Sequence, residues 1–72
     1  MAKFSELPHT TQSAISNNTF DVEPSELSDK QRTELNALTP NELFKSYLEW
    51  NGIIGYSSSI HYTHELIFGK SS

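Results

Sequence analysis

The spacing of apolar and polar residues changes near residue 24. Residues 1–20 are rich in Ser, Thr, Asn and Gln, and their large apolar residues are Phe4, Leu7, Ile15 and Phe20. This composition favours a flexible segment, so we predict that residues 1–23 form a poorly ordered or partner-ordered N-terminal arm. The alternative is one short helix, which would begin near Pro8 and end near Asn17, although the residues between them are poor helix formers.

The first clear helix start lies at Ser28. Ser28 and Gln31 have the three-residue spacing of a capping box, and Asp29 adds negative charge to the first turn, where the helix dipole favours it. We therefore predict a helix over residues 29–38. Its leucines lie three residues apart and form one narrow apolar stripe, so this helix needs a neighbour to cover it.

A second helix start follows almost at once. Thr39 can cap the helix, Pro40 suits the first helical position, and Glu42 completes a capping box. We predict a helix over residues 40–51 that ends because Gly52 adopts a left-handed conformation. Since almost no loop separates it from the preceding helix, the two must turn sharply, as in a helical hairpin or a helix-turn-helix corner. Its large apolar residues are Leu43, Phe44, Tyr47, Leu48 and Trp50.

The last apolar segment, residues 57–68, fits two patterns. Ser57 can cap a helix and Gly69 can end it. Alternation of Ile60, Tyr62, His64, Leu66 and Phe68 is also typical of a strand. We favour the helix because no second segment with comparable alternation could pair with a strand.

The length of 72 residues limits the chain to one domain, which buries only about 60% of its unfolded surface. The sequence has no cysteine, so no disulfide or thiolate zinc site supplements the core. We predict a mainly α fold, a small helical bundle or hairpin over residues 24–69, followed by a tail at 70–72. No segment approaches the roughly 20 apolar residues of a membrane span, and no signal peptide is evident, so we expect a cytoplasmic protein.

The charged residues argue against direct nucleic-acid binding. The net charge is −4, and the five basic residues are too dispersed to follow a phosphate backbone. Four acidic residues lie close together instead and could contact a basic partner: Asp21, Glu23, Glu26 and Asp29. One hypothesis is therefore an acidic nucleic-acid mimic that blocks a basic nucleic-acid-binding protein. A solvated linker and helix start is the simpler interpretation of the same residues.

Few residues suggest catalytic or metal chemistry. His61, His64 and Glu65 have the helical spacing of metal ligands, and His9 could add a third nitrogen, but this spacing is weakly specific. The residue types of a nucleophilic triad occur at 57–65, without the scaffold that such chemistry uses. We therefore expect no enzymatic activity and no cofactor or metal, and a His-based metal-binding mini-enzyme is only a remote alternative.

The aromatic residues are the strongest candidates for partner contacts. Tyr47, Trp50 and Tyr56 belong to the types enriched at interface hot spots. Most of the aromatic surface must form the core of so small a domain, but one short neighbouring helix cannot cover all of it. The remainder could bind a partner protein or mediate a homodimer.

Residues 41–60 carry a resemblance to a known group of proteins. An aromatic-rich helix followed by Gly52-Ile53-Ile54-Gly55-Tyr56, a serine-rich cap and Ile60 resembles small uncharacterised accessory proteins of tailed bacteriophages and prophages. The resemblance implies a protein that binds and modulates or inhibits a host protein or a defence complex. It brings no catalytic residue. The stretch 61–64 departs from the pattern, because its residues favour a helix less.

Overall fold

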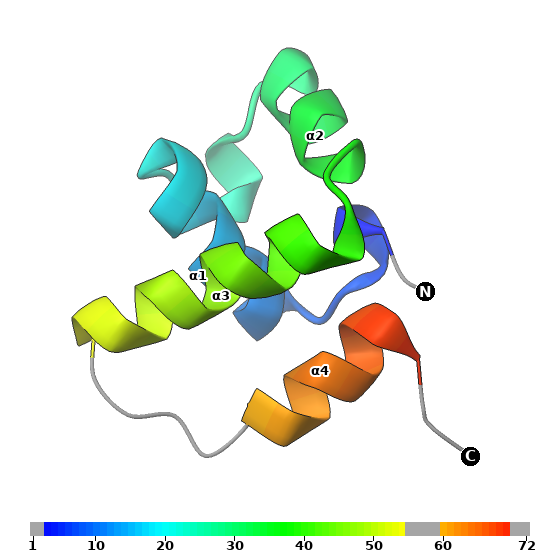
Figure 1. The fold of residues 1–72 in the computed structure, drawn as a ribbon. Helices are drawn as coiled ribbons and strands as arrows, with labels where there is room; N and C mark the ends of the chain where they lie inside the picture. The colour runs from blue at the N-terminus through cyan, green and yellow to red at the C-terminus, as the bar shows by residue number, and fades with distance from the viewer. Residues whose placement is uncertain (1–2, 55–59, 70–72) are drawn as a thin grey trace.

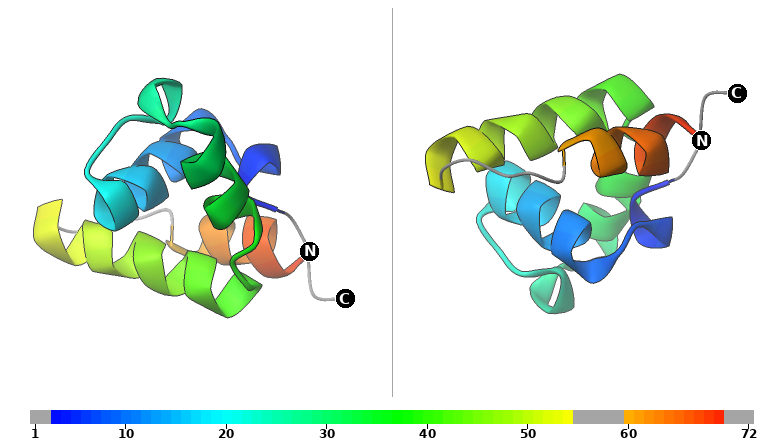
Figure 2. Two further views of the ribbon diagram at one scale, coloured as in Figure 1. Left: turned by 90° about the horizontal axis from the view of Figure 1, so that it is seen from above. Right: turned by 90° about the horizontal axis from the view of Figure 1, so that it is seen from below.

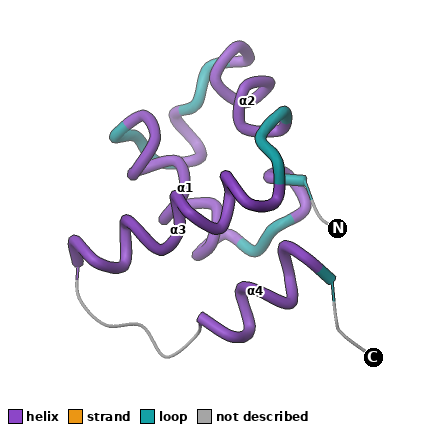
Figure 3. The backbone as a smooth tube through the Cα atoms, in the orientation of Figure 1, coloured by secondary structure: helices purple, strands orange, loops and turns teal. Residues whose placement is uncertain are grey.

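The computed structural model describes residues 3–54 and 60–69, and for residues 53 and 54 it describes the backbone alone. The described residues form helices and no strand (Figures 1 and 3), which confirms the prediction of a mainly α fold. In chain order the elements are η1 (Phe4–Glu6), α1 (His9–Phe20), η2 (Pro24–Glu26), α2 (Asp29–Asn36), α3 (Pro40–Ile54) and α4 (Ile60–Phe68).

Helix α3 lies at the centre of the fold. It packs mainly against α1 and also against α4, whereas α2 packs against η1 and η2 packs against α1 (Figures 1 and 2). Only residues 37–39 connect α2 to α3, so the connection is short, as predicted. The two helices do not form the main helical pair, however, because α1 is the principal neighbour of α3.

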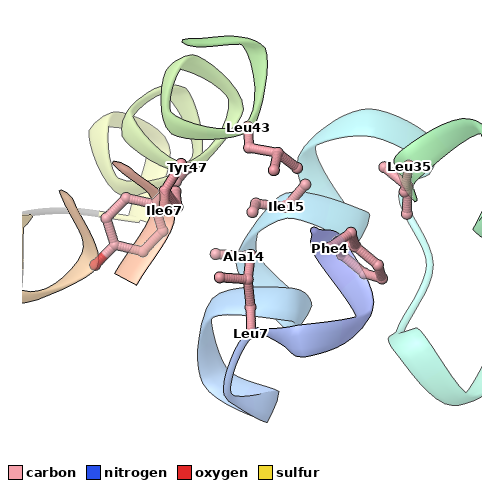
Figure 4. Close-up of a cluster of buried hydrophobic side chains, with 8 residues drawn as sticks. All are labelled: Phe4, Leu7, Ala14, Ile15, Leu35, Leu43, Tyr47 and Ile67. Carbon is pink, nitrogen blue, oxygen red and sulfur yellow. The ribbon is translucent and has the colours of Figure 1, made fainter. Parts of the chain in front are cut away.

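The hydrophobic core draws on both ends of the chain. Buried apolar side chains come from η1, α1, α2, α3 and α4 and meet in one cluster (Figure 4). Its members are Phe4, Leu7, Ala14, Ile15, Leu35, Leu43, Tyr47 and Ile67. Burial of this apolar surface is the main favourable term in the stability of the fold.

The prediction of a flexible arm at residues 1–23 is wrong for the described residues of this segment. Phe4 and Ile15 are fully buried, and the segment forms helix α1, the alternative of a short helix near Pro8. A polar composition is compatible with burial here because some of the buried residues of α1 are small, among them Ala14 and Ser16. The amide of Asn17 further stabilises α1 by donating to the carbonyl oxygen of Ser13 at 2.8 Å.

Helix α1 ends at a residue with an unusual backbone conformation. Asp21 has φ 59° and ψ 37°, and its backbone N–H donates to the carbonyl oxygen of Asn17 at 2.9 Å. This left-handed conformation commonly ends helices and is tolerated by Asp better than by β-branched residues. Asp21, which is one of the four clustered acidic residues of the sequence, therefore ends α1.

Both predicted capping boxes are present. The Ser28 hydroxyl accepts from the backbone N–H of Gln31 at 3.1 Å, and the Gln31 side chain accepts from the N–H of Ser28 at 3.0 Å. Thr39 and Glu42 make the same reciprocal pair at 3.2 and 2.9 Å. These bonds satisfy helix N–H groups that have no partner within the helix.

The predicted end of α3 at Gly52 is wrong, whereas the predicted end of α4 is confirmed. Helix α3 continues through Gly52 to Ile54. Gly69 has φ 91°, and its N–H donates to the carbonyl oxygen of Glu65 at 2.8 Å, as expected of a glycine that ends a helix.

The segment 60–68 is helical, so the helix interpretation was correct and the strand alternative was not. The proposed Ser57 cap and the 70–72 tail lie outside the described residues.

Candidate functional site

A groove lies where the N-terminal half of α1, the C-terminal half of α3 and the start of α4 meet. Its volume is about 410 Å³, within the range of small-ligand pockets. The described residues that line it are His9, Thr10, Thr11, Ser13, Ala14, Tyr47, Trp50, Asn51, Tyr62 and Thr63. Carboxylate, lysine and arginine side chains are absent from this described lining.

Three aromatic side chains give the groove its apolar surface. Tyr47 is buried within the core, Trp50 is half-buried against it, and Tyr62 is 60% exposed. An aromatic side chain with this exposure beside a concave surface is a suitable contact for a partner. The core interpretation of Tyr47 therefore holds, but the residue also forms one wall of the groove.

The polar side of the groove is held in place by local hydrogen bonds. Asn51 is buried, and its Nδ2 donates to the carbonyl oxygen of Tyr47 at 2.9 Å, which fixes the amide against α3. On α1, the Ser13 hydroxyl donates to Glu23 Oε2 at 3.0 Å. The groove therefore has anchored polar groups on two of its three sides, and neither residue was singled out from the sequence.

A smaller polar cleft of about 310 Å³ separates the C-terminal end of α1 from α3. Ser46 is one of the residues that line it and is buried. Its hydroxyl accepts from Asn18 Nδ2 at 3.1 Å and lies 3.1 Å from Thr19 Oγ1, while Asn18 Nδ2 also lies 3.4 Å from Glu49 Oε1. The network joins two helices, and its hydrogen-bonding groups are already paired with one another, so we assign it a structural role.

The four acidic residues follow the chain from the end of α1 to the start of α2, and two of them have structural partners. Glu23 accepts from Ser13 and from Asn17 Nδ2, the latter at 3.0 Å, and these bonds, that from Asn17 foremost, lower the pKa of its carboxyl. Glu26 accepts weakly from the N–H of Glu23 at 3.4 Å. The remaining two, Asp21 and Asp29, are exposed at helix ends.

The histidines of α4 point to different neighbours. His61 Nε2 lies 3.1 Å from Glu65 Oε1 on the exposed side of the helix. The His64 ring contacts the rings of Phe44 and Phe68, with centroid separations of 5.2 and 4.5 Å. Within residues 3–54 and 60–69, no group of three or more His, Asp or Glu side chains is placed to hold a metal ion. His9, which was considered as a further ligand, lines the groove and adds no support to a metal site at His61, His64 and Glu65.

No protein-family model matches the sequence, and neither a curated protein nor a solved structure matches the chain. Within the described part of the chain, no helix is both long and apolar enough to cross a membrane. Since no known protein matches, the function of the groove has to be inferred from the residues that line it.

Of the aromatic residues predicted to bind a partner, Tyr47 and Trp50 share the groove, and Tyr56 lies outside the described residues. The sequence did not identify Tyr62 as a site residue. One signal was available: in a helix over 57–68, a large aromatic residue that falls off the face of Ile60, Thr63 and Ile67 must face solvent.

Proposed function

We propose that this protein is a phage-type accessory protein that binds a host protein and modulates or inhibits it. The observation that carries the proposal is that the exposed Tyr62 and the half-buried Trp50 both line the 410 Å³ groove. Tyr and Trp dominate interface hot spots because they bury a large area while losing little rotamer freedom. The phage origin is supported by the resemblance of residues 41–60 to phage accessory proteins.

The shape of the groove supports insertion of a partner side chain. It is concave, and residues of three helices line it. Tyr47 belongs to the hydrophobic core and Trp50 packs against it. Side chains already packed in or against the core, as Tyr47 and Trp50 are, lose less entropy on binding than flexible side chains do. We therefore place the centre of the interface at Trp50 and Tyr62.

The test compares two substitutions on α4. Tagged wild-type protein, Tyr62→Ser and His61→Ser are used to capture binding proteins from bacterial lysate at low and high salt, and each captured protein is identified by mass spectrometry and purified. His61 is the matched control because its side chain is 87% exposed, lies outside the groove lining and makes an exposed pair of small energetic value.

The purified partner is then titrated against each variant. We expect Tyr62→Ser to weaken binding at least about tenfold, as truncation of a hot-spot aromatic does, and His61→Ser to bind like wild type. Equal affinities of wild type and Tyr62→Ser would contradict the proposal. If Tyr62→Ser binds like wild type at low salt and both lose binding at high salt, the contact would be assigned to the acidic residues between positions 21 and 29 instead.

A further inference from the structure

The N-terminus of helix α1 is uncapped where it borders the groove. Its cap position is Pro8, which offers no side-chain acceptor, and the first backbone bond runs from Gln12 N to the Pro8 carbonyl oxygen. The backbone N–H groups of residues 9–11 therefore have no acceptor among the described residues. All three residues line the groove, and helix N-termini carry partial positive charge that favours an anion.

Two buried hydroxyl groups point to the same kind of ligand. Thr11 is 4% exposed and Thr63 is 1% exposed, yet neither side chain hydrogen-bonds to another described residue. Every described side-chain oxygen or nitrogen that is fully sealed from solvent has a partner. These two hydroxyls therefore keep a small solvent-accessible area. Both residues line the groove, so the hydroxyls can donate to an acceptor placed there.

The residues that line the groove indicate how much negative charge the acceptor should carry. A phosphate group has about two negative charges, and its sites commonly supply Lys or Arg, which the described lining lacks. A carboxylate has one charge, and helix N–H groups with hydroxyl donors satisfy it. Beside these donors lie the apolar surfaces of Ala14, Trp50 and Tyr62. The ligand should therefore combine a carboxylate with an adjacent apolar group.

We propose that the groove binds the C-terminal residue of the partner polypeptide. The terminal carboxylate accepts from the first-turn N–H groups of α1 and from the hydroxyls of Thr11 and Thr63, while the terminal apolar side chain lies against Trp50 and Tyr62. A C-terminal residue carries both groups on one Cα atom, and capture of such carboxylates by backbone N–H groups is a recurring mode of peptide recognition. This inference rests on the proposed function and names the part of the partner that enters the groove.

The test uses three small probes and the intrinsic fluorescence of Trp50, which is the single tryptophan of the chain and lines the groove. The probes are N-acetyl-Leu-Phe as the free acid, the same dipeptide as its C-terminal amide, and N-acetyl-Ala-Ala as the free acid. At neutral pH we expect the Leu-Phe acid to bind at least about tenfold more tightly than its amide, because only the acid carries the charge that the helix terminus favours. The Ala-Ala acid should bind more weakly than the Leu-Phe acid.

Thr11→Val tests the hydroxyl, since valine keeps the shape and removes the donor. We expect affinity for the Leu-Phe acid to fall at least about fivefold and affinity for the amide to fall less, because a hydrogen bond to a charged acceptor is the stronger one. Thr33→Val is the matched control, because Thr33 is exposed on α2 and its hydroxyl donates to the Asp29 carbonyl oxygen at 2.8 Å. Circular dichroism establishes that each variant is folded, and Thr63→Val repeats the test if Thr11→Val is not.

The outcomes separate this inference from the function on which it rests. Equal affinities for acid and amide, or a Thr11→Val variant that binds the acid like wild type, would overturn carboxylate recognition. Tyr62-dependent binding of the purified partner could persist in that case, and the proposed function would stand. Failure of all probes to bind would also overturn the inference, and loss of Tyr62 dependence would overturn the function itself.

Discussion

Truncation of Phe4 distinguishes a folded N-terminal segment from a flexible arm. Phe4 is fully buried in the core cluster, although it lies at the start of a polar segment. Replacement of a buried phenylalanine by alanine removes apolar burial and leaves a cavity, at a cost of about 3–5 kcal/mol. A chain of this length has a total free energy of unfolding of about 4–11 kcal/mol at 0.05–0.15 kcal/mol per residue. We therefore expect Phe4→Ala to remove about a quarter of the stability or more.

Urea-induced unfolding, followed by circular dichroism and Trp50 fluorescence, measures this loss. Ser5→Ala is the matched control because Ser5 is exposed on the same turn and contributes a backbone N–H, rather than its hydroxyl, to the bond with Asn36 Oδ1. The control should change the free energy of unfolding by less than about 0.5 kcal/mol. A Phe4→Ala variant as stable as Ser5→Ala would refute the placement of the N-terminal segment in the core.

Two further predictions concern helix ends. Asp21→Val should lower the free energy of unfolding by about 1–3 kcal/mol, because a β-branched residue is strained at φ 59°, whereas Asp21→Gly should stay within about 1 kcal/mol of wild type in the same urea assay. Equal losses for both variants would contradict the strain argument. Hydrogen bonds from Thr39 hold the pKa of the Glu42 carboxyl below its ordinary value of 4.5, so its contribution to stability is present above that pH and is lost as pH falls through the lower, folded-state pKa. Thermal unfolding of Glu42→Gln from about pH 6 to about pH 3 should show a shallower decline than wild type, and identical curves would refute the assignment.

Local chemistry made the helix starts predictable. The Ser28 and Thr39 boxes depend on residues three positions apart, so their presence can be read without knowledge of the tertiary structure. The end of α3 could not be read in this way. Gly52 is permitted to leave the helix but is not required to do so, and α3 continues to Ile54.

The N-terminal segment and the groove depend on contacts between residues distant in sequence. Helix α1 has few large apolar residues, and the burial of its small residues Ala14 and Ser16 is visible only in the packed structure. Tyr62 and Thr11 become neighbours of one groove only when α4 and α1 meet. Sequence periodicity carries no information on such pairing, so Tyr47 and Trp50 were predicted while the other lining residues were missed.

The pairing of α1 with α3 has a consequence for how fast the chain folds. Asn18 contacts Ser46 across 28 residues, and Ile15 and Ser46 are separated by 31, in a chain of 72. An all-helical protein with mostly local contacts folds within microseconds to milliseconds, but here the intervening loop must close before the central helix pair exists. Closing this loop costs entropy that a sequential helical hairpin does not pay, so we expect the chain to fold more slowly than such a hairpin of the same length.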